Sequence, residues 1–148
     1  MSLVQEQLHA SDNVNSIDFR EYIYNLVMNL NNSYGNEKKV SIDLVLENVI
    51  LDVSMASPCG LIANEVLTNS FKYAFNEKNL FPELKVSLKK VGDRIELVFS
   101  DNGGGFDSDK VADGMGLDLI MGLADQVDGE IQVEISNGVQ TSLSVNCT

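Results

Sequence analysis

The sequence has few of the residues that mark several common functional classes. It contains no tryptophan, one histidine and two cysteines, and its ten basic residues face 22 acidic ones, for a formal net charge of −12. A chain this acidic repels phosphate backbones and anionic lipid surfaces, so we expect neither nucleic acid nor membrane as a partner of this piece. Cys59 and Cys147 form no close-spaced ligand pair, and the sequence predicts neither a zinc site nor a disulfide framework.

Long apolar runs are also missing. No stretch approaches the roughly 18 residues that a membrane span needs, and the start, Met1 to Gln5, lacks the basic and apolar regions of a signal peptide. We therefore expect a cytoplasmic protein, or a cytoplasmic piece of something longer. With 148 residues, 44% of them hydrophobic, the chain can bury one core of ordinary size. This predicts a single domain over residues 16–148 behind a polar lead-in over residues 1–15.

Hydrophobic periodicity in the first half predicts two helices around a strand. A capping box at Asp18 to Glu21 precedes a helical stripe that runs to about residue 31. Apolar and polar residues alternate over residues 40–46, which indicates a strand. Pro58 then suits the first turn of a long helix that runs to about Asn76.

The second half predicts two hairpins with a helix between them. Apolar positions alternate over residues 85–100 around Gly92-Asp93, and again over residues 131–145 around Asn137-Gly138. Helical spacing returns over residues 116–127, where Gly129 is placed to end the helix. The order helix, strand, helix, two strands, helix, two strands predicts an α/β layer with a mixed sheet.

The predicted long helix carries a polar stripe. At about 100° per residue, Glu65, Asn69 and Lys72 fall on one narrow face, and Asn64 lies away from it. An Asn oxygen suits Mg²⁺, a lysine serves phosphates as a point charge, and Glu65 is one turn from Asn69, where it could act as a general base. Such a stripe is also typical of an ordinary solvated helix face. The glycine segments decide between this interpretation and a ligand-binding face.

The first glycine segment follows Asp101, at the end of a predicted strand, and reads Asn102-Gly103-Gly104-Gly105. A carboxylate only accepts hydrogen bonds, so Asp101 can pair with the exocyclic amino group of adenine but is repelled by the carbonyl oxygen of guanine. Glycines leave room for a ring to approach the backbone. A plain Asp-Asn-Gly turn is the alternative interpretation.

The second glycine segment, Gly114-Met115-Gly116, precedes the helix that begins near Leu117. A glycine-flanked helix start offers free amides and a positive dipole to phosphate. The polar segment over residues 106–113 is short enough to be a small mobile lid, and Lys110 within it could reach a phosphate. The fingerprints of a Rossmann fold and of a P-loop are absent. Together with the polar stripe, the two glycine segments predict an ATP site.

These segments resemble known motifs in order. Residues 64–75 look like the N box of the superfamily that joins gyrase, histidine kinases and mismatch-repair ATPases, Asp101 to Gly105 resembles its G1 box, and Gly114 to Leu117 resembles its G2 box. Over about residues 8–146 the chain is similar to the catalytic domain of two-component sensor histidine kinases with a short lid. The resemblance implies a two-layer Bergerat-type α/β sandwich, with a mixed β-sheet covered on one face by about three helices.

The resemblance also implies ATP and Mg²⁺ as cofactors and gives roles to individual residues. Asn69 would hold Mg²⁺, Lys72 would lie near the phosphates, Tyr73 beside the nucleotide and Asp101 on adenine. Thr141 would join the adenine network through water. The other nucleotide-binding residues, in the boxes that the resemblance identifies, are Gly103, Gly105, Gly114, Met115, Gly116 and Leu117. From its place on the polar stripe, Glu65 is predicted to be the catalytic residue.

Two departures from the family pattern matter. The lack of tryptophan excludes the short-lid subgroup whose signature includes one. We expect the family's phosphoacceptor helix, with its His followed by a basic residue and an Asn pair, to be missing from this sequence, and His9 in the polar lead-in is not expected to replace it. The resemblance thus implies a histidine protein kinase domain that is not competent for autophosphorylation alone. It would transfer the γ-phosphoryl of Mg-ATP to a histidine on a dimerisation helix, normally in the same polypeptide, with a response regulator downstream.

Two alternatives remain open from the sequence. A serine kinase of the anti-sigma-factor kind shares the fold and size, but its N box typically ends in a His-Ala-Tyr type sequence, where this chain has Lys72-Tyr73-Ala74. A non-enzymatic module, in which ATP occupancy controls binding to a partner, is the second alternative. The intact pair Glu65 and Asn69 argues against it.

Overall fold

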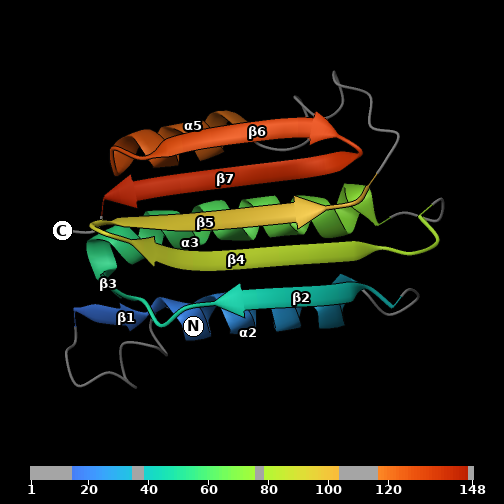
Figure 1. The fold of residues 1–148 in the computed structure, drawn as a ribbon, viewed down its shortest axis with the longest axis horizontal. Helices are drawn as coiled ribbons and strands as arrows, with labels where there is room; N and C mark the ends of the chain where they lie inside the picture. Colours follow the sequence, from blue (N-terminus) through green and yellow to red (C-terminus); the bar gives the residue numbers. More distant parts are fainter. Residues whose placement is uncertain (1–14, 35–38, 76–78, 104–116, 147–148) are drawn as a thin grey trace.

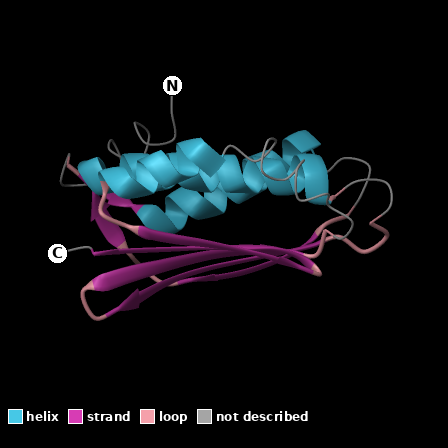
Figure 2. Ribbon diagram, turned by 90° about the horizontal axis from the view of Figure 1, so that it is seen from above, coloured by secondary structure: helices cyan, strands magenta, loops and turns pink. Residues whose placement is uncertain are grey.

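The chain forms two layers, a sheet on one side and helices on the other (Figures 1 and 2). The computed structural model describes residues 15–34, 39–75, 79–103 and 117–146. The elements are β1 (Ser16–Asp18), α2 (Phe19–Tyr34), β2 (Ser41–Leu46), β3 (Ile50–Asp52), α3 (Val53–Asn69), η1 (Ser70–Ala74), β4 (Glu83–Val91), β5 (Arg94–Asp101), α5 (Leu117–Gln126), β6 (Glu130–Ser136) and β7 (Gly138–Asn146).

The main sheet has five strands in the order β2-β4-β5-β7-β6. β2 pairs with β4 in parallel and the other pairs are antiparallel, so the sheet is mixed. Within the described residues, α2, α3 and α5 all lie on one face of it (Figure 2). The predicted α/β fold, a mixed sheet covered on one face by three helices, is therefore confirmed.

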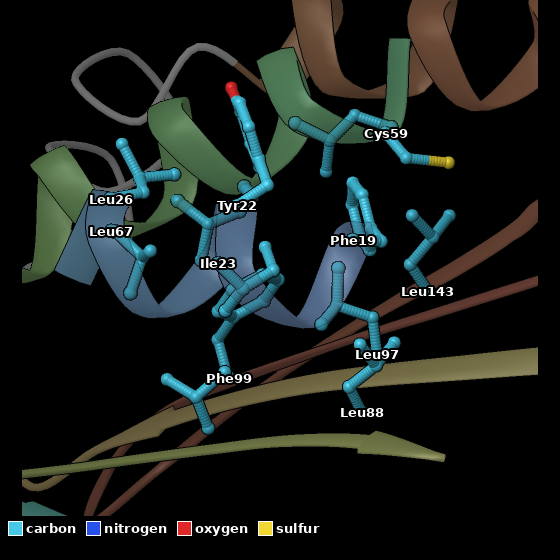
Figure 3. Packing of buried hydrophobic residues seen from close by; sticks show 14 of the residues in the cluster. Phe19, Tyr22, Ile23, Leu26, Cys59, Leu67, Leu88, Leu97, Phe99 and Leu143 are labelled. Atoms are coloured by element: carbon cyan, nitrogen blue, oxygen red, sulfur yellow. The ribbon is translucent and has the colours of Figure 1, made fainter. Parts of the chain in front are cut away.

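The core lies between these two layers. Alternate positions on the central strands face the helices, and Leu88, Leu97 and Phe99 there are at most 2% exposed. Phe19 of α2 and Leu67 of α3 pack onto them from the helix layer (Figure 3). Complete burial of such a side chain contributes about 1.5–3 kcal/mol. The opposite face of the sheet is polar, which explains the clear alternation in the sequence.

The N-cap half of the predicted capping box at the first helix is confirmed. The Asp18 carboxylate accepts a hydrogen bond from the Glu21 amide at 3.2 Å, and the helix runs to Tyr34, three residues beyond the predicted end. The structure also pairs β1 with β3 as a separate antiparallel ribbon that the sequence analysis missed. Three residues are too few to show an alternating pattern.

The predicted start of the long helix at Pro58 is wrong. α3 begins at Val53, because Asp52 caps it by accepting a hydrogen bond from the Ser54 amide at 3.0 Å. The α-helical geometry then ends at Asn69, and the next five residues form the π-helical turn η1. Because a π-turn has more residues per turn, the projection at about 100° per residue does not apply beyond Asn69.

The second half matches the prediction more closely. Both hairpins and the helix between them are present, and β5 ends at Asp101 as expected. At the end of α5, however, Asp128 rather than Gly129 has the positive φ of 53°. The Gly129 amide donates to the Ala124 carbonyl at 2.8 Å. Gly129 is required for a different reason, since a β-carbon there would lie 2.8 Å from Val145 Cγ1.

No helix in the described ranges is both long enough and apolar enough to cross a membrane.

Candidate nucleotide-binding site

Buried polar side chains concentrate at one end of the sandwich. Among the described residues they are Asn69 (4% exposed), Ser70 (4%), Asp101 (8%) and Thr141 (1%). The first two lie where α3 passes into η1, Asp101 ends β5, and Thr141 lies on β7. Burial of polar groups is costly unless they have partners, so a cluster of them marks a functional site.

The Asp101 carboxylate is held at three points. Its Oδ1 atom accepts hydrogen bonds from the amides of Gly103 at 3.1 Å and Val139 at 3.2 Å. Its Oδ2 atom accepts one from the Ser70 hydroxyl at 2.8 Å. A carboxylate has about four acceptor positions, so one position on Oδ2 remains for a ligand.

Burial dominates the electrostatics of this carboxylate. Desolvation raises the pKa of Asp101, and the hydrogen bonds from Ser70, Gly103 and Val139 lower it in part. These donors bind the charged form best, which keeps the carboxylate ready to accept a hydrogen bond. The geometry suits a group that must accept one further hydrogen bond in a nearly dry environment.

Thr141 lies on the same face of the sheet as Asp101. In the β5–β7 ladder Asp101 pairs with Val139 and Phe99 pairs with Thr141, so the two polar side chains are diagonal neighbours. The Thr141 hydroxyl makes no side-chain hydrogen bond in the part of the chain that the structure describes. A buried hydroxyl of this kind fits a site that a ligand or an ordered water completes.

The turn after Asp101 lies against the end of η1. A β-carbon on Gly103 would lie 2.4 Å from the Ala74 Cβ atom, so only glycine fits this contact. The side chain of Asn102 accepts hydrogen bonds from the Asn79 side chain at 3.0 Å and the Glu83 amide at 2.8 Å. Asn79 in turn donates to the Ala74 carbonyl at 3.2 Å. The two halves of the site are therefore fixed to each other.

The contacts of Asn79, Asn102 and Ser70 are not visible in the sequence. Asn102 lies inside a recognised motif, but its partners are far away in sequence and no local pattern reveals them. In the helical projection Ser70 lies far from the polar stripe of Glu65, Asn69 and Lys72, so its position in the sequence gives it no functional signal. Its proximity to Asp101 follows from the packing of η1 on the end of the sheet.

The residues of the predicted polar stripe differ in their exposure to solvent. Asn69 is buried, Glu65 is half-buried, and Lys72 and Tyr73 on η1 are exposed, Tyr73 by 41%. Asn64 is exposed, as expected for a residue outside the stripe. Lys72 and Tyr73 lie on the π-turn, so the helical projection at about 100° per residue does not give the directions of their side chains. Of the predicted residues, Asn69, Asp101, Gly103 and Thr141 belong to the buried cluster or contact it.

The glycine-flanked helix start lies outside the described residues. This holds for Gly105, Gly114, Met115 and Gly116, and also for Lys110 and His9. Leu117 is the first residue of α5. The roles that the sequence predicts for these residues stay predictions.

A cavity of about 680 Å³ lies apart from this cluster, between the start of α2 and strand β2. Its lining includes Glu21 and Tyr24 from the helix and Leu44 and Leu46 from the strand. It contains none of the residues predicted to bind nucleotide. The buried polar groups, rather than this hollow, therefore locate the candidate site.

Two family models match the chain. One, described as histidine kinase-, DNA gyrase B-, and HSP90-like ATPase, matches residues 55–147. The other, described as histidine kinase, matches residues 1–34. No curated protein matches the chain in sequence.

Solved histidine kinase structures share the fold. The histidine kinase domain of the Erythrobacter litoralis blue-light activated kinase EL346 aligns with a TM-score of 0.85 and 18% identity, over 98% of this chain and 70% of that one. For the mycobacterial sensor histidine kinase MprB the TM-score is 0.70 and the identity 15%, over 88% and 95% of the two chains. The present chain spans 50% of the longer EL346 chain. At these identities the likeness establishes the fold alone.

The first model covers more than half of the chain, so the chain belongs to the family of histidine kinase-, DNA gyrase B- and HSP90-like ATPases. It is the ATP-binding catalytic domain of a histidine kinase, because a histidine kinase model matches residues 1–34 ahead of the ATPase model that matches residues 55–147. Its enzyme class is accordingly histidine protein kinase.

Proposed function

We propose that this domain binds Mg-ATP in the buried polar cluster and positions the γ-phosphoryl group for attack by a histidine on a partner helix. The observation that carries the proposal is the Asp101 carboxylate, 8% exposed, with three protein donors and one open acceptor position. Such a carboxylate can take one N–H from a ligand, as the exocyclic amino group of adenine would require.

Adenine fits the surroundings of Asp101. The glycine at position 103 removes the β-carbon that would otherwise meet Ala74, and it leaves the backbone close to the site. Thr141 offers a buried hydroxyl beside the carboxylate, and this supports its role in a water-linked adenine network. A guanine carbonyl in the same place would face the negative Oδ2 atom and be repelled.

The phosphate end of the ligand would be held near the junction of α3 and η1. Asn69 offers an amide oxygen to Mg²⁺, and Lys72 offers a positive charge to phosphate oxygens. The described residues contain no cluster of three or more His, Cys, Asp or Glu side chains. The single Asn69 oxygen, together with phosphate oxygens of the ligand, fits Mg²⁺, because this ion binds through few protein oxygens. When bound, Mg²⁺ would neutralise charge on the phosphates.

Glu65 is the proposed catalytic residue. It lies one turn before Asn69 on α3 and is half-buried, so it can reach the solvent side of the site. There it would orient the attacking histidine or accept its proton. Phosphoryl transfer depends mainly on positioning and charge stabilisation, and this small residue set suffices for that.

The phosphoryl acceptor is proposed to be a helix that normally belongs to the same polypeptide, with a response regulator downstream. The match of residues 1–34 to a histidine kinase model supports this. We propose that residues 1–15 are the end of that phosphoacceptor region and that residues 16–148 form the catalytic domain.

A transfer assay tests the proposal. The protein is mixed with Mg-ATP and either a histidine-bearing phosphoacceptor helix or a serine-bearing antagonist protein of the anti-sigma-factor type. We expect acid-labile phosphate on the helix and none on the serine substrate. Labelling of serine alone would support a serine kinase instead, and absence of transfer despite ATP binding would favour a non-enzymatic module.

A further inference from the structure

Ser70 contacts the Asp101 carboxylate from the helix layer. Its hydroxyl donates to Asp101 Oδ2 at 2.8 Å and lies 3.3 Å from the Val66 carbonyl oxygen. The side chain is 4% exposed, so water does not replace this contact easily. Ser70 is the first residue of the π-turn η1. A local change in helix geometry thus coincides with the hydrogen bond to Asp101.

The two oxygens of Asp101 are held differently. Backbone amides of Gly103 and Val139 hold Oδ1, and any substitution other than proline leaves those donors in place. Oδ2 has a single protein donor among the described residues, the Ser70 hydroxyl. The Oδ2 atom also carries the acceptor position left for a ligand. Its orientation and its charge therefore depend on Ser70.

We propose that Ser70 is a positioning residue that keeps the Oδ2 atom of Asp101 an obligate hydrogen-bond acceptor and thereby sets the preference of this site for adenine over guanine. The inference rests on the proposed function, since it concerns the base that Asp101 would contact.

The chemical basis is the protonation state of the carboxyl group. An ionised carboxylate only accepts, whereas a protonated one also donates and could pair with the carbonyl oxygen of guanine. Burial raises the pKa of Asp101, and the Ser70 hydrogen bond is the largest of the effects that lower it. Loss of this hydroxyl would therefore raise the pKa further and weaken discrimination between the bases.

The other groups that face Asp101 are neutral. They are the Gly103 amide at the end of its own strand and the Val139 amide and Thr141 hydroxyl on β7. Among the described residues, no charged side chain contributes to the shift in the pKa of Asp101. A change in the pH dependence of ligand binding in a Ser70 variant can therefore be attributed to the lost hydrogen bond.

The test compares Ser70→Ala with Ser100→Ala in the full chain. Ser100 precedes Asp101 on β5, and its side chain faces the opposite side of the sheet, so this variant makes the same chemical change without touching the carboxylate. Affinities for ATP and GTP are measured by calorimetry from about pH 8 down toward about pH 4, the usual pKa of an aspartate side chain. Circular dichroism confirms that each variant is folded.

For Ser70→Ala we expect ATP binding about three- to tenfold weaker at about pH 7, with GTP binding unchanged or tighter. The loss of ATP affinity on acidification should begin at higher pH than in the wild type. Ser70→Cys has a similar size but is a weak donor, so its values should fall between those of Ser70→Ala and the wild type. Ser100→Ala should match the wild type.

Two results would overturn the inference in distinguishable ways. If the wild type binds ATP and Ser70→Ala keeps the same ATP-to-GTP ratio and the same pH profile, the role of Ser70 is wrong and the proposed function stands. If the folded wild type does not bind ATP, the proposed function fails and the inference fails with it. A merely structural Ser70 would change thermal stability without moving the pH profile.

Discussion

Gly103 and Ala74 are in such close contact that no side chain fits between them. A β-carbon on Gly103 would lie 2.4 Å from the Ala74 Cβ atom and 2.5 Å from its Cα atom. This contact joins the turn after Asp101 to the end of η1, and the Asn79 and Asn102 side chains reinforce it. The Asp101 carboxylate and the end of η1 are therefore held in fixed positions relative to each other, although about 30 residues of sequence lie between them.

Gly103→Ala should destabilise the fold by about 1–3 kcal/mol and weaken ATP binding, because the new methyl group has to displace backbone atoms. Gly122→Ala is the matched control. Gly122 lies inside α5 with open space around it, so alanine there should stabilise the helix by about 0.5–1 kcal/mol. Urea unfolding measures both variants, and equal effects would show that the Gly103 contact relaxes without cost.

Asp101→Asn should weaken ATP binding by about ten- to a hundredfold, since a charge-assisted hydrogen bond contributes about 1.5–3 kcal/mol. The amide keeps the shape of the carboxylate but presents an N–H where the ligand needs an acceptor if Nδ2 takes the Oδ2 position. Asp43→Asn on the exposed face of β2 is the control. Unchanged affinity in Asp101→Asn would remove the adenine role of this residue.

The difference in stability between the wild type and Asp101→Asn should depend on pH. Burial raises the pKa of Asp101 above the usual 3.8, so the folded chain binds this proton more tightly than the unfolded chain. The stability that Asp101 contributes is present in acid, below 3.8, and is lost as the pH rises through the raised pKa. Asparagine does not titrate. The Tm of Asp101→Asn minus that of the wild type should therefore rise from acid to neutral pH. A difference that falls instead would show that burial does not outweigh the hydrogen bonds in setting the pKa of Asp101.

Asn69→Ala should abolish the gain in ATP affinity that Mg²⁺ provides, because the variant lacks the amide oxygen proposed to bind the metal. Asn64→Ala changes the same residue type within the same motif at an exposed position. Calorimetric titrations with and without Mg²⁺ compare the two variants. If Asn69→Ala retains the metal effect, the Mg²⁺ ligand lies at another residue.

The chain alone should not label itself with radioactive ATP, since its phosphoacceptor helix is proposed to lie outside it. His9 is the only histidine in the sequence, which makes the test unambiguous. Acid-labile labelling that disappears in His9→Gln would identify His9 as the acceptor and contradict the proposed domain division. Addition of a histidine-bearing helix should give labelling on the helix in both proteins.

The sheet could be predicted well because each of its long strands buries one face. Positions such as Val86 and Leu88 alternate with polar neighbours, and this pattern is visible without tertiary information. The ribbon of β1 and β3 could not be predicted, since three residues carry no period. Pro58 gave the wrong helix start because the capping signal of Asp52 decided the boundary instead.

Part of the candidate site could be singled out from the sequence, because some of its residues carry a local signal. Asp101 is such a residue, since it is a carboxylate at a strand end followed by glycines. Ser70 was not found, because its role depends on a partner 31 residues away and on a π-turn that helical projection cannot anticipate. Contacts between distant segments determine which polar residues act together.

Calorimetric binding of ATP and GTP to the wild-type chain, each with and without Mg²⁺, is the most direct test of the central claim. We expect binding of ATP that Mg²⁺ strengthens and a clear preference for ATP over GTP. Equal affinity for the two nucleotides, or no binding by a folded sample, would contradict a site built around the buried carboxylate of Asp101.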